Sequence, residues 1–441
     1  MFSSIVINKK VHNKYDFSFI LFFIGLLFYF AEYIRHAIHL DGIIAPRQII
    51  FFSVLSGPFF MFLSMLKALQ EGKLKSLMIF YRKWYLLLIF IVVMLLMSGT
   101  LIFSNGPREI LFDFIIFPGI FAGILAGTKT NNINYCDKLI RIVFFLSTLF
   151  CILKLGNLGA RAIQSTRLDR ADYTWDSIYY IWGLIGLLWP YVIIKNENRR
   201  SIFRNIIPML GTSIYFIMAI IYGKRQPFVQ LALFLLLIFI KARGSHKYKF
   251  LVMSALVVGI VLLIVIGIFK SNDWKQFQTV WINRFSINGG IWNMFINDDR
   301  ISYDPLLILT QFSGIELLIG RGLGGVVRDV SGFYPVENTP NLHNGAAFIV
   351  LKGGLLLLIV WAVGWLRFIK DFLGEKNRKL YRFYIPYLII FMQIFYSPVL
   401  SDTGGFVFLM MCSGFAMSNK KIKINNETTS NIPRKTGRSN G

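Results

Sequence analysis

The feature that most constrains the fold is a series of apolar runs along the chain. Of the 441 residues, 55% are hydrophobic. A helix needs about 20 residues to cross a hydrocarbon core about 30 Å thick, and many of the runs are close to that length. Backbone groups in lipid must be hydrogen-bonded within the protein, so each run predicts a spanning helix rather than an open strand. The expected fold class is therefore all-α, a polytopic helical membrane protein.

The runs predict twelve spans and one long polar segment. The spans are 17–34, 48–69, 84–103, 110–127, 138–155, 177–194, 205–222, 226–240, 250–269, 345–369, 383–400 and 403–417. Four regions follow: 1–269 with helices one to nine, 270–344 as a large periplasmic loop with short helices, 345–417 with helices ten to twelve, and 418–441 as a tail. The tail is polar and basic, which predicts a disordered cytoplasmic end.

The distribution of positive charge predicts the orientation. The formal net charge is +25, which would suit nucleic acid, but most basic residues stand in short loops between spans. With the N-terminus inside, the inner segments 1–16, 70–83, 128–138, 195–204, 241–249, 370–382 and 418–441 carry 28 Lys and Arg, and the short outer loops carry 8. This positive-inside bias predicts a multi-pass plasma (bacterial inner) membrane protein with both termini cytoplasmic and no nucleic-acid partner.

His343 is the sharpest candidate for chemistry. It stands where the long loop meets the tenth run, with Asn344 beside it, on the predicted outer face. A histidine there can exchange a proton near neutral pH. The alternative is an interfacial histidine at a simple helix start. The three cysteines show no metal-ligand spacing, and neither a metal nor a cofactor is expected.

Arginines on the predicted outer face form the second candidate set. They are Arg161, Arg167, Arg170, Arg225, Arg284, Arg300, Arg321 and Arg328. A guanidinium group binds phosphate through two parallel hydrogen bonds, which suits a lipid diphosphate at that depth. Lys224 and Arg225 occupy a very short turn between two apolar runs. The alternatives are ion pairs with nearby acids such as Asp169 or Asp329, and snorkelling of Lys224 and Arg225 to headgroups.

Two further features lie near the tenth run. Lys352 stands inside it, and an intramembrane lysine is a functional candidate unless it pairs with Asp113 or Glu109 of the fourth run. Gly353 and Gly354 beside it allow close contact with another element. In the loop, the apolar stretch 306–318 suits an interfacial helix. Gly320–Gly325 predicts a tight, flexible turn that is only weakly similar to a phosphate cradle.

These parts, in this order, resemble the O-antigen ligase and O-antigen polymerase superfamily. The resemblance rests on Leu317–Gly324, on His343-Asn344 opening an apolar helix with Leu351 and Gly354, and on Arg284 ahead of Ile291-Trp292. Arg225 is similar to a short arginine turn of that family, although Lys224 and Gln226 flank it. Lys352 departs from the family pattern, because many members carry an acidic residue there. The resemblance covers about residues 210–370.

The resemblance implies a glycosyltransferase that uses a polyprenyl-diphosphate-linked oligosaccharide without a metal. It implies that His343 acts as general base and that Arg225 and Arg284 hold the diphosphate of undecaprenyl diphosphate. Substrate contacts are then expected from Lys224, Arg161, Arg167, Arg170, Arg321, Arg328 and Asn344. The expected activity is polymerisation of repeat units into O-antigen or capsular polysaccharide, with membrane lipid and a chain-length regulator as partners. The alternatives are a ligase that moves glycan to lipid A core and a flippase for the same lipid.

Overall fold

The computed structural model describes about three fifths of the chain. The described residues are 17–40, 47–73, 93–94, 96–103, 105–107, 110, 113, 119, 122–126, 133–165, 177–196, 203–221, 226–241, 299–329, 337–339, 342, 344–392, 408, 410–412 and 414–416. Most of them are helical, and the described strands are two residues long. The all-α prediction is confirmed for this part of the chain.

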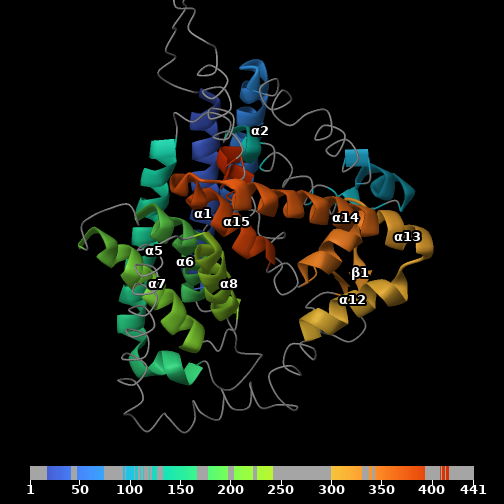
Figure 1. Cartoon of the computed structure of the whole chain (residues 1–441). Coiled ribbons are helices and arrows are strands. Elements are labelled where there is room, and N and C mark those ends of the chain that lie inside the picture. Colours follow the sequence, from blue (N-terminus) through green and yellow to red (C-terminus); the bar gives the residue numbers. More distant parts are fainter. Residues whose placement is uncertain are drawn as a thin grey trace, which may run out of the picture.

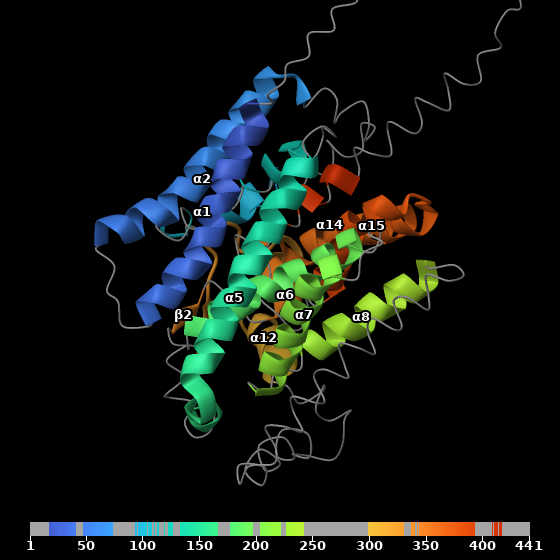
Figure 2. The same cartoon turned by 90° about the vertical axis from the view of Figure 1, so that its left-hand side faces the viewer.

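Apart from the helix that begins at Gly345, which is described below, seven of the described helices coincide with predicted apolar runs. They are α1 (Phe17–Leu40), α2 (Arg47–Gln70), α5 (Ile133–Ser165), α6 (Ser177–Asn196), α7 (Phe203–Ile221), α8 (Gln226–Lys241) and α15 (Tyr381–Met392). Figures 1 and 2 both show α1 and α2 side by side. Some boundaries were wrong: α1 continues to Leu40 beyond the predicted end at 34, and α5 continues through Arg161 to Ser165, into the segment 156–176 between the fifth and sixth predicted spans. The ninth predicted span, 250–269, lies outside the described residues.

The main core lies between these helices and is rich in aromatic side chains. Trp189 and Tyr191 of α6 and Phe383 of α15 are fully buried there. On α5, Ile140, Phe144 and Cys151 are buried in this core. The opposite face of α5 is apolar and exposed, with Ile142, Leu146 and Leu153 more than half exposed. A helix that is apolar all round is typical of a protein core or a membrane span.

Helix α14 (Gly345–Gly374) links this core to the long loop. Within the described ranges it is the one helix long and apolar enough to cross a bilayer, and shorter apolar helices lie at Phe17–Ala31, Ile181–Ile194, Pro208–Ala219 and Pro227–Lys241. The count of twelve spans therefore stays a prediction. The backbone of α14 breaks at Gly354, which has φ 67° and ψ −172°. Figure 1 shows its long part running across the direction of α1 and α5.

The described part of the long loop forms a small folded unit, here called the loop unit (residues 299–329 and 337–339). It contains α12 (Asp299–Gln311), α13 (Gly314–Ile319) and the antiparallel pair β1 (Val327–Arg328) and β2 (Asn338–Thr339). The stretch predicted as one interfacial helix is divided, because Ser313 caps α13 through a capping box with Glu316.

A second hydrophobic core joins the loop unit to the start of α14. Leu307 and Ile308 of α12, Val327 of β1, and Phe348 and Leu351 of α14 pack together in it. At its other end α14 places Phe368 and Phe372 in the main core, and a 3-10 turn (Arg378–Leu380) leads on to α15. Helix α14 thus enters both cores, with Gly354 between them.

Candidate functional site

The N-terminus of α14 is held by Asn344. Its side-chain oxygen accepts from the backbone N–H groups of Ala346 (3.0 Å) and Ala347 (3.1 Å), which satisfies two amides that have no partner inside the helix. The Asn344 N–H donates to Asp304 of α12 at 2.6 Å. Leu342 is fully buried in the second core. His343 lies outside the described residues, but both of its neighbours in the chain are held firmly.

The glycine turn 320–325 is anchored to the broken part of α14. The break at Gly354 interrupts the helical ladder, so the carbonyls ahead of it are available to other donors. Arg321 N–H donates to Leu351 O at 2.8 Å, and Gly322 N–H donates to Lys352 O at 3.0 Å. Gly320 fits closely here, because an added Cβ would stand 2.5 Å from the backbone nitrogens of Gly353 and Gly354.

The remaining amides of the turn are also hydrogen-bonded. Leu323 N–H donates to Thr100 Oγ1 (2.7 Å), Gly324 N–H to Asp113 Oδ2 (2.6 Å) and Gly325 N–H to Gly322 O (3.2 Å). All five amides from Arg321 to Gly325 therefore have acceptors within the protein. The turn is tight, as predicted, but its amides do not form a phosphate cradle.

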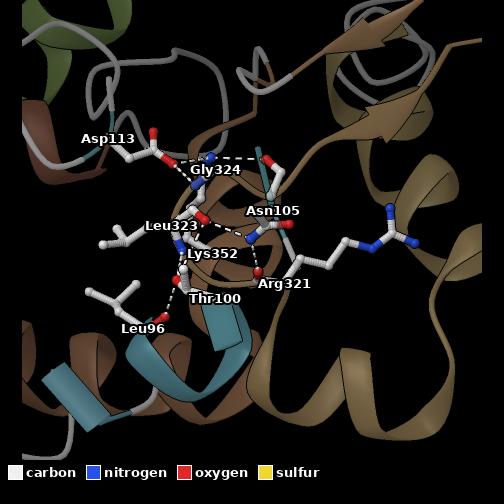
Figure 3. A network of polar contacts seen from close by, with 9 residues as sticks. Leu96, Thr100, Asn105, Asp113, Arg321, Leu323, Gly324 and Lys352 are labelled. Atoms are coloured by element: carbon white, nitrogen blue, oxygen red, sulfur yellow. Dashed lines mark hydrogen bonds and ion pairs between the residues drawn. The ribbon is translucent and has the colours of Figure 1, made fainter. Parts of the chain in front are cut away.

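A buried ion pair closes the junction between the turn and α14. Lys352 Nζ lies 2.5 Å from Asp113 Oδ2 and 3.0 Å from Gly325 O, and it stands over the Phe348 ring. The same Asp113 oxygen accepts from Gly324, so one carboxylate joins two segments (Figure 3). The pairing of Lys352 with Asp113, one of the alternatives drawn from the sequence, is confirmed.

Asn105 fastens the turn from a third side. Its amide Nδ2 donates to Arg321 O and Leu323 O, each at 2.6 Å (Figure 3). Thr100, Asn105 and Asp113 thus meet residues 320–325 and 351–354 in one network, here called the junction.

The two candidate arginines with described side chains are both ion-paired. Arg321 Nε lies 2.9 Å from Glu316, and its Nη1 and Nη2 donate to the carbonyls of Val326 and Gln311. Its guanidinium also stacks over Phe312. Arg321 is therefore ion-paired with a nearby acid, as the alternative predicted, although the acid is Glu316. Its contacts hold parts of the loop unit together.

Arg328 pairs with Glu337 across the β1–β2 ladder at 2.5 Å. Its side chain is 67% exposed, so this pair lies at the surface.

Glu316 is a further part of this arrangement. Burial raises the pKa of its carboxyl group, but the hydrogen bonds from Ser313 and Arg321 and the charge of Arg321 lower it, and the balance is a pKa below the ordinary value. Glu316 is therefore held as a carboxylate that supports both the α13 cap and Arg321.

Most of the other candidates lie outside the described residues. These are His343, Lys224, Arg225, Arg284, Arg167 and Arg170. The backbone of Arg161 belongs to α5 and that of Arg300 to α12, without a described side chain. Among the described residues, the structure joins Asn344, Lys352 and Arg321 through adjacent parts of α14 and the turn.

Sequence reasoning missed a second buried polar cluster. Asp137 of α5 lies 3.3 Å from Arg382 Nε and accepts from the Tyr191 hydroxyl at 2.6 Å. The signal for it was available, since Asp137 and Arg382 each stand at an end of an apolar run on the predicted inner side. Gln230, which accepts from Trp189 and Tyr215, is a third such group.

Comparison with known proteins adds no family. No protein-family model matches the chain, and no curated protein matches it either.

Proposed function

We propose that this chain is a polytopic membrane glycosyltransferase that polymerises undecaprenyl-diphosphate-linked oligosaccharide units on the outer face of the bacterial plasma membrane. The twelve spans, the cytoplasmic termini and the O-antigen or capsular product belong to this proposal. The observation that carries it is the built N-terminus of α14. Leu342 and Asn344 are both buried, and they flank His343 at the start of the one helix, among the described residues, that is long and apolar enough to cross a bilayer.

The contacts between helix ends support the proposed topology. Ser18 contacts Glu71, Asp137 contacts Arg382, and Lys241 donates to the carbonyls of Leu373 and Glu375. Each of these pairs joins positions that the charge bias assigns to the inner side. The junction instead joins residues 100, 105 and 113 with 320–325, which the same bias assigns to the outer side. Alternating spans predict this sorting of contacts.

In the proposed reaction, His343 accepts the proton of the attacking sugar hydroxyl. The hydroxyl oxygen forms a bond to the anomeric carbon of the donor, and the bond from that carbon to the diphosphate oxygen breaks. Arg225 and Arg284 hold the departing diphosphate charge, and no metal is needed for this. Arg161, Arg167 or Arg170 would steer the acceptor, and Lys224 would contact the substrate.

The described arginines narrow the roles within the site. Each of the three nitrogens of the Arg321 guanidinium has a partner inside the loop unit. In the proposal Arg321 therefore stabilises the loop unit, and Arg225 and Arg284 bind the diphosphate. Arg328 remains a candidate for contact with the substrate because its side chain is exposed.

The test is chain extension by purified protein supplied with a lipid-linked repeat. His343→Ala should lower the rate by about 10²–10⁴-fold, the usual contribution of a general base. His246→Ala, in a predicted inner loop, is the matched control and should change little. Chains of normal length from His343→Ala would overturn the assignment of His343.

The product separates the alternative functions. Longer glycan on the lipid carrier supports the polymerase, whereas transfer to lipid A core alone would indicate the ligase. Movement of the lipid across a bilayer without any glycosyl transfer would indicate the flippase.

A further inference from the structure

We infer that Lys352 and Asp113 form a positioning pair, which fixes the glycine turn against α14 and thereby sets the helix end that begins at Asn344. Neither residue is assigned a contact with substrate. The inference deepens the proposed function, because the end of α14 that the pair holds is the one that follows His343.

The geometry assigns Lys352 to the protein and not to an anionic ligand. An ammonium group has three donors. At Lys352 one N–H donates to Asp113 and another to Gly325 O, and the ammonium group stands 5.4 Å from the centre of the Phe348 ring. The side chain is 6% exposed. An intramembrane lysine is a functional candidate by default, and here its donors face the turn.

The pair connects three segments through a single atom. Asp113 Oδ2 accepts from Lys352 of α14 and from the Gly324 N–H of the turn. Lys352 also donates to Gly325 O of the turn. If α14, the turn or the segment of Asp113 moved, two of these three buried hydrogen bonds would therefore change at once. The glycine turn also binds α14 directly, because the amides of Arg321 and Gly322 donate to Leu351 O and Lys352 O. The outer nine residues of α14 thus depend on Asp113, which is more than 200 positions away in the chain.

A role in positioning fits the energetics better than a role in stability. A buried ion pair adds little net stability compared with neutral residues of similar size, while the best-attested use of such groups is to fix one register. Misplacement of a catalytic group by about 1 Å can cost about 10²-fold in rate. The pair is therefore expected to matter more for the rate than for folding.

The experiment compares full-length variants in lipid nanodiscs. Asp113→Asn leaves Lys352 charged without its carboxylate, and amide exchange should accelerate together in residues 320–329 and 345–353. The double variant Asp113→Asn/Lys352→Met removes both charges but keeps an acceptor for Gly324. It should fold with a thermal midpoint near that of the wild type and lose about tenfold or more in kcat for chain extension, with KM for the lipid-linked donor changed by less than about twofold.

Three outcomes would overturn the inference. They are a double variant with unchanged kcat, a variant in which KM rises while kcat holds, and a double variant that does not fold. The matched control is Asp137→Asn/Arg382→Met, which neutralises the other buried pair and should leave kcat near the wild-type value.

Failure of the proposed function would be visible separately. A wild-type protein that extends no chain would contradict the glycosyltransferase, and the exchange measurement would still test the pair. If amide exchange in residues 320–329 and 345–353 of Asp113→Asn stayed at the wild-type rate, the positioning role of the pair would then be overturned.

Discussion

The junction around Lys352 and the cluster around Asp137 each contain a buried ion pair, but the groups that surround the two pairs differ. At the junction, backbone amides and carbonyls of a glycine turn and a broken helix supply most of the partners. At the cluster, Tyr191 and Arg382 reach Asp137 from two intact helices, among Phe383 and Phe408. The first depends on close approach of backbones, and the second on side-chain packing.

This difference predicts which substitutions each region tolerates. Backbone atoms cannot move aside, so an added methyl group at the junction has nowhere to go. Side chains in an aromatic core can repack by changing rotamers, at a smaller cost. The same chemical change should therefore cost more at the junction than at the cluster.

The largest effect is expected from Gly354→Ala. Gly354 has φ 67°, and an added Cβ would collide with the carbonyl of Leu318. Left-handed strain and the collision add up, so the free energy of unfolding should fall by about 5 kcal/mol. Gly364→Ala in the same helix is the control, because nothing lies within 4 Å of its added Cβ. Equal unfolding midpoints for the two variants in detergent would contradict the account of the break.

The sequence predicted the apolar helices better than it predicted the junction. Apolar runs gave the starts of α1, α6, α8 and α14, because burial in a core or in lipid depends on composition that a window can count. The break in α14 was signalled only by Gly353-Gly354, which the sequence suggested as a site of close contact. The partners of the turn are backbone groups, which every residue has, so no residue pattern could identify them.

The choice of partner for Lys352 shows the same limit. The sequence offered Asp113 and Glu109, which stand close together at the start of the fourth apolar run. The structure pairs Lys352 with Asp113. Selecting between two acids needs the tertiary position of each carboxylate. For Asp137 and Arg382 even the pairing was missed, because neither lies inside a predicted span, where a charged side chain calls for a partner.

Arg382→Met should have the second-largest effect. It leaves the Asp137 carboxylate buried at 4% exposure, with the Tyr191 hydroxyl as one remaining partner. Breaking a buried pair costs about 3–5 kcal/mol, and the retained hydrogen bond favours the lower end. Lys370→Met, at an exposed position of α14, is the control and should change the free energy of unfolding by less than about 0.5 kcal/mol. A loss as large as that of Gly354→Ala would remove the contrast between the two regions.

Tyr191→Phe should have a smaller effect in the same cluster. It deletes one hydroxyl that donates to Asp137 and keeps the ring packed against Phe383 and Phe408. A hydrogen bond to a charged group contributes about 1.5–3 kcal/mol. In the double variant with Arg382→Met the two losses should not add, because both act on one carboxylate. Additive losses in a double-mutant cycle would mean that Tyr191 and Arg382 act independently.

The smallest effect is expected from acidification of the loop unit. The pKa of Glu316 is below its ordinary value in the folded protein, so its carboxylate stabilises the fold at neutral pH. This contribution should be present above about pH 4.3, the ordinary value for glutamate, and should be lost as the pH falls through the lowered folded value. The protection factors of the amides in residues 313–328, which correct for the intrinsic pH dependence of exchange, should therefore fall below that pH, as Ser313 and Arg321 lose their charged partner. Glu316→Gln should exchange faster at neutral pH and respond less to acid. If the wild type and Glu316→Gln respond equally to acid, another group controls the loop unit.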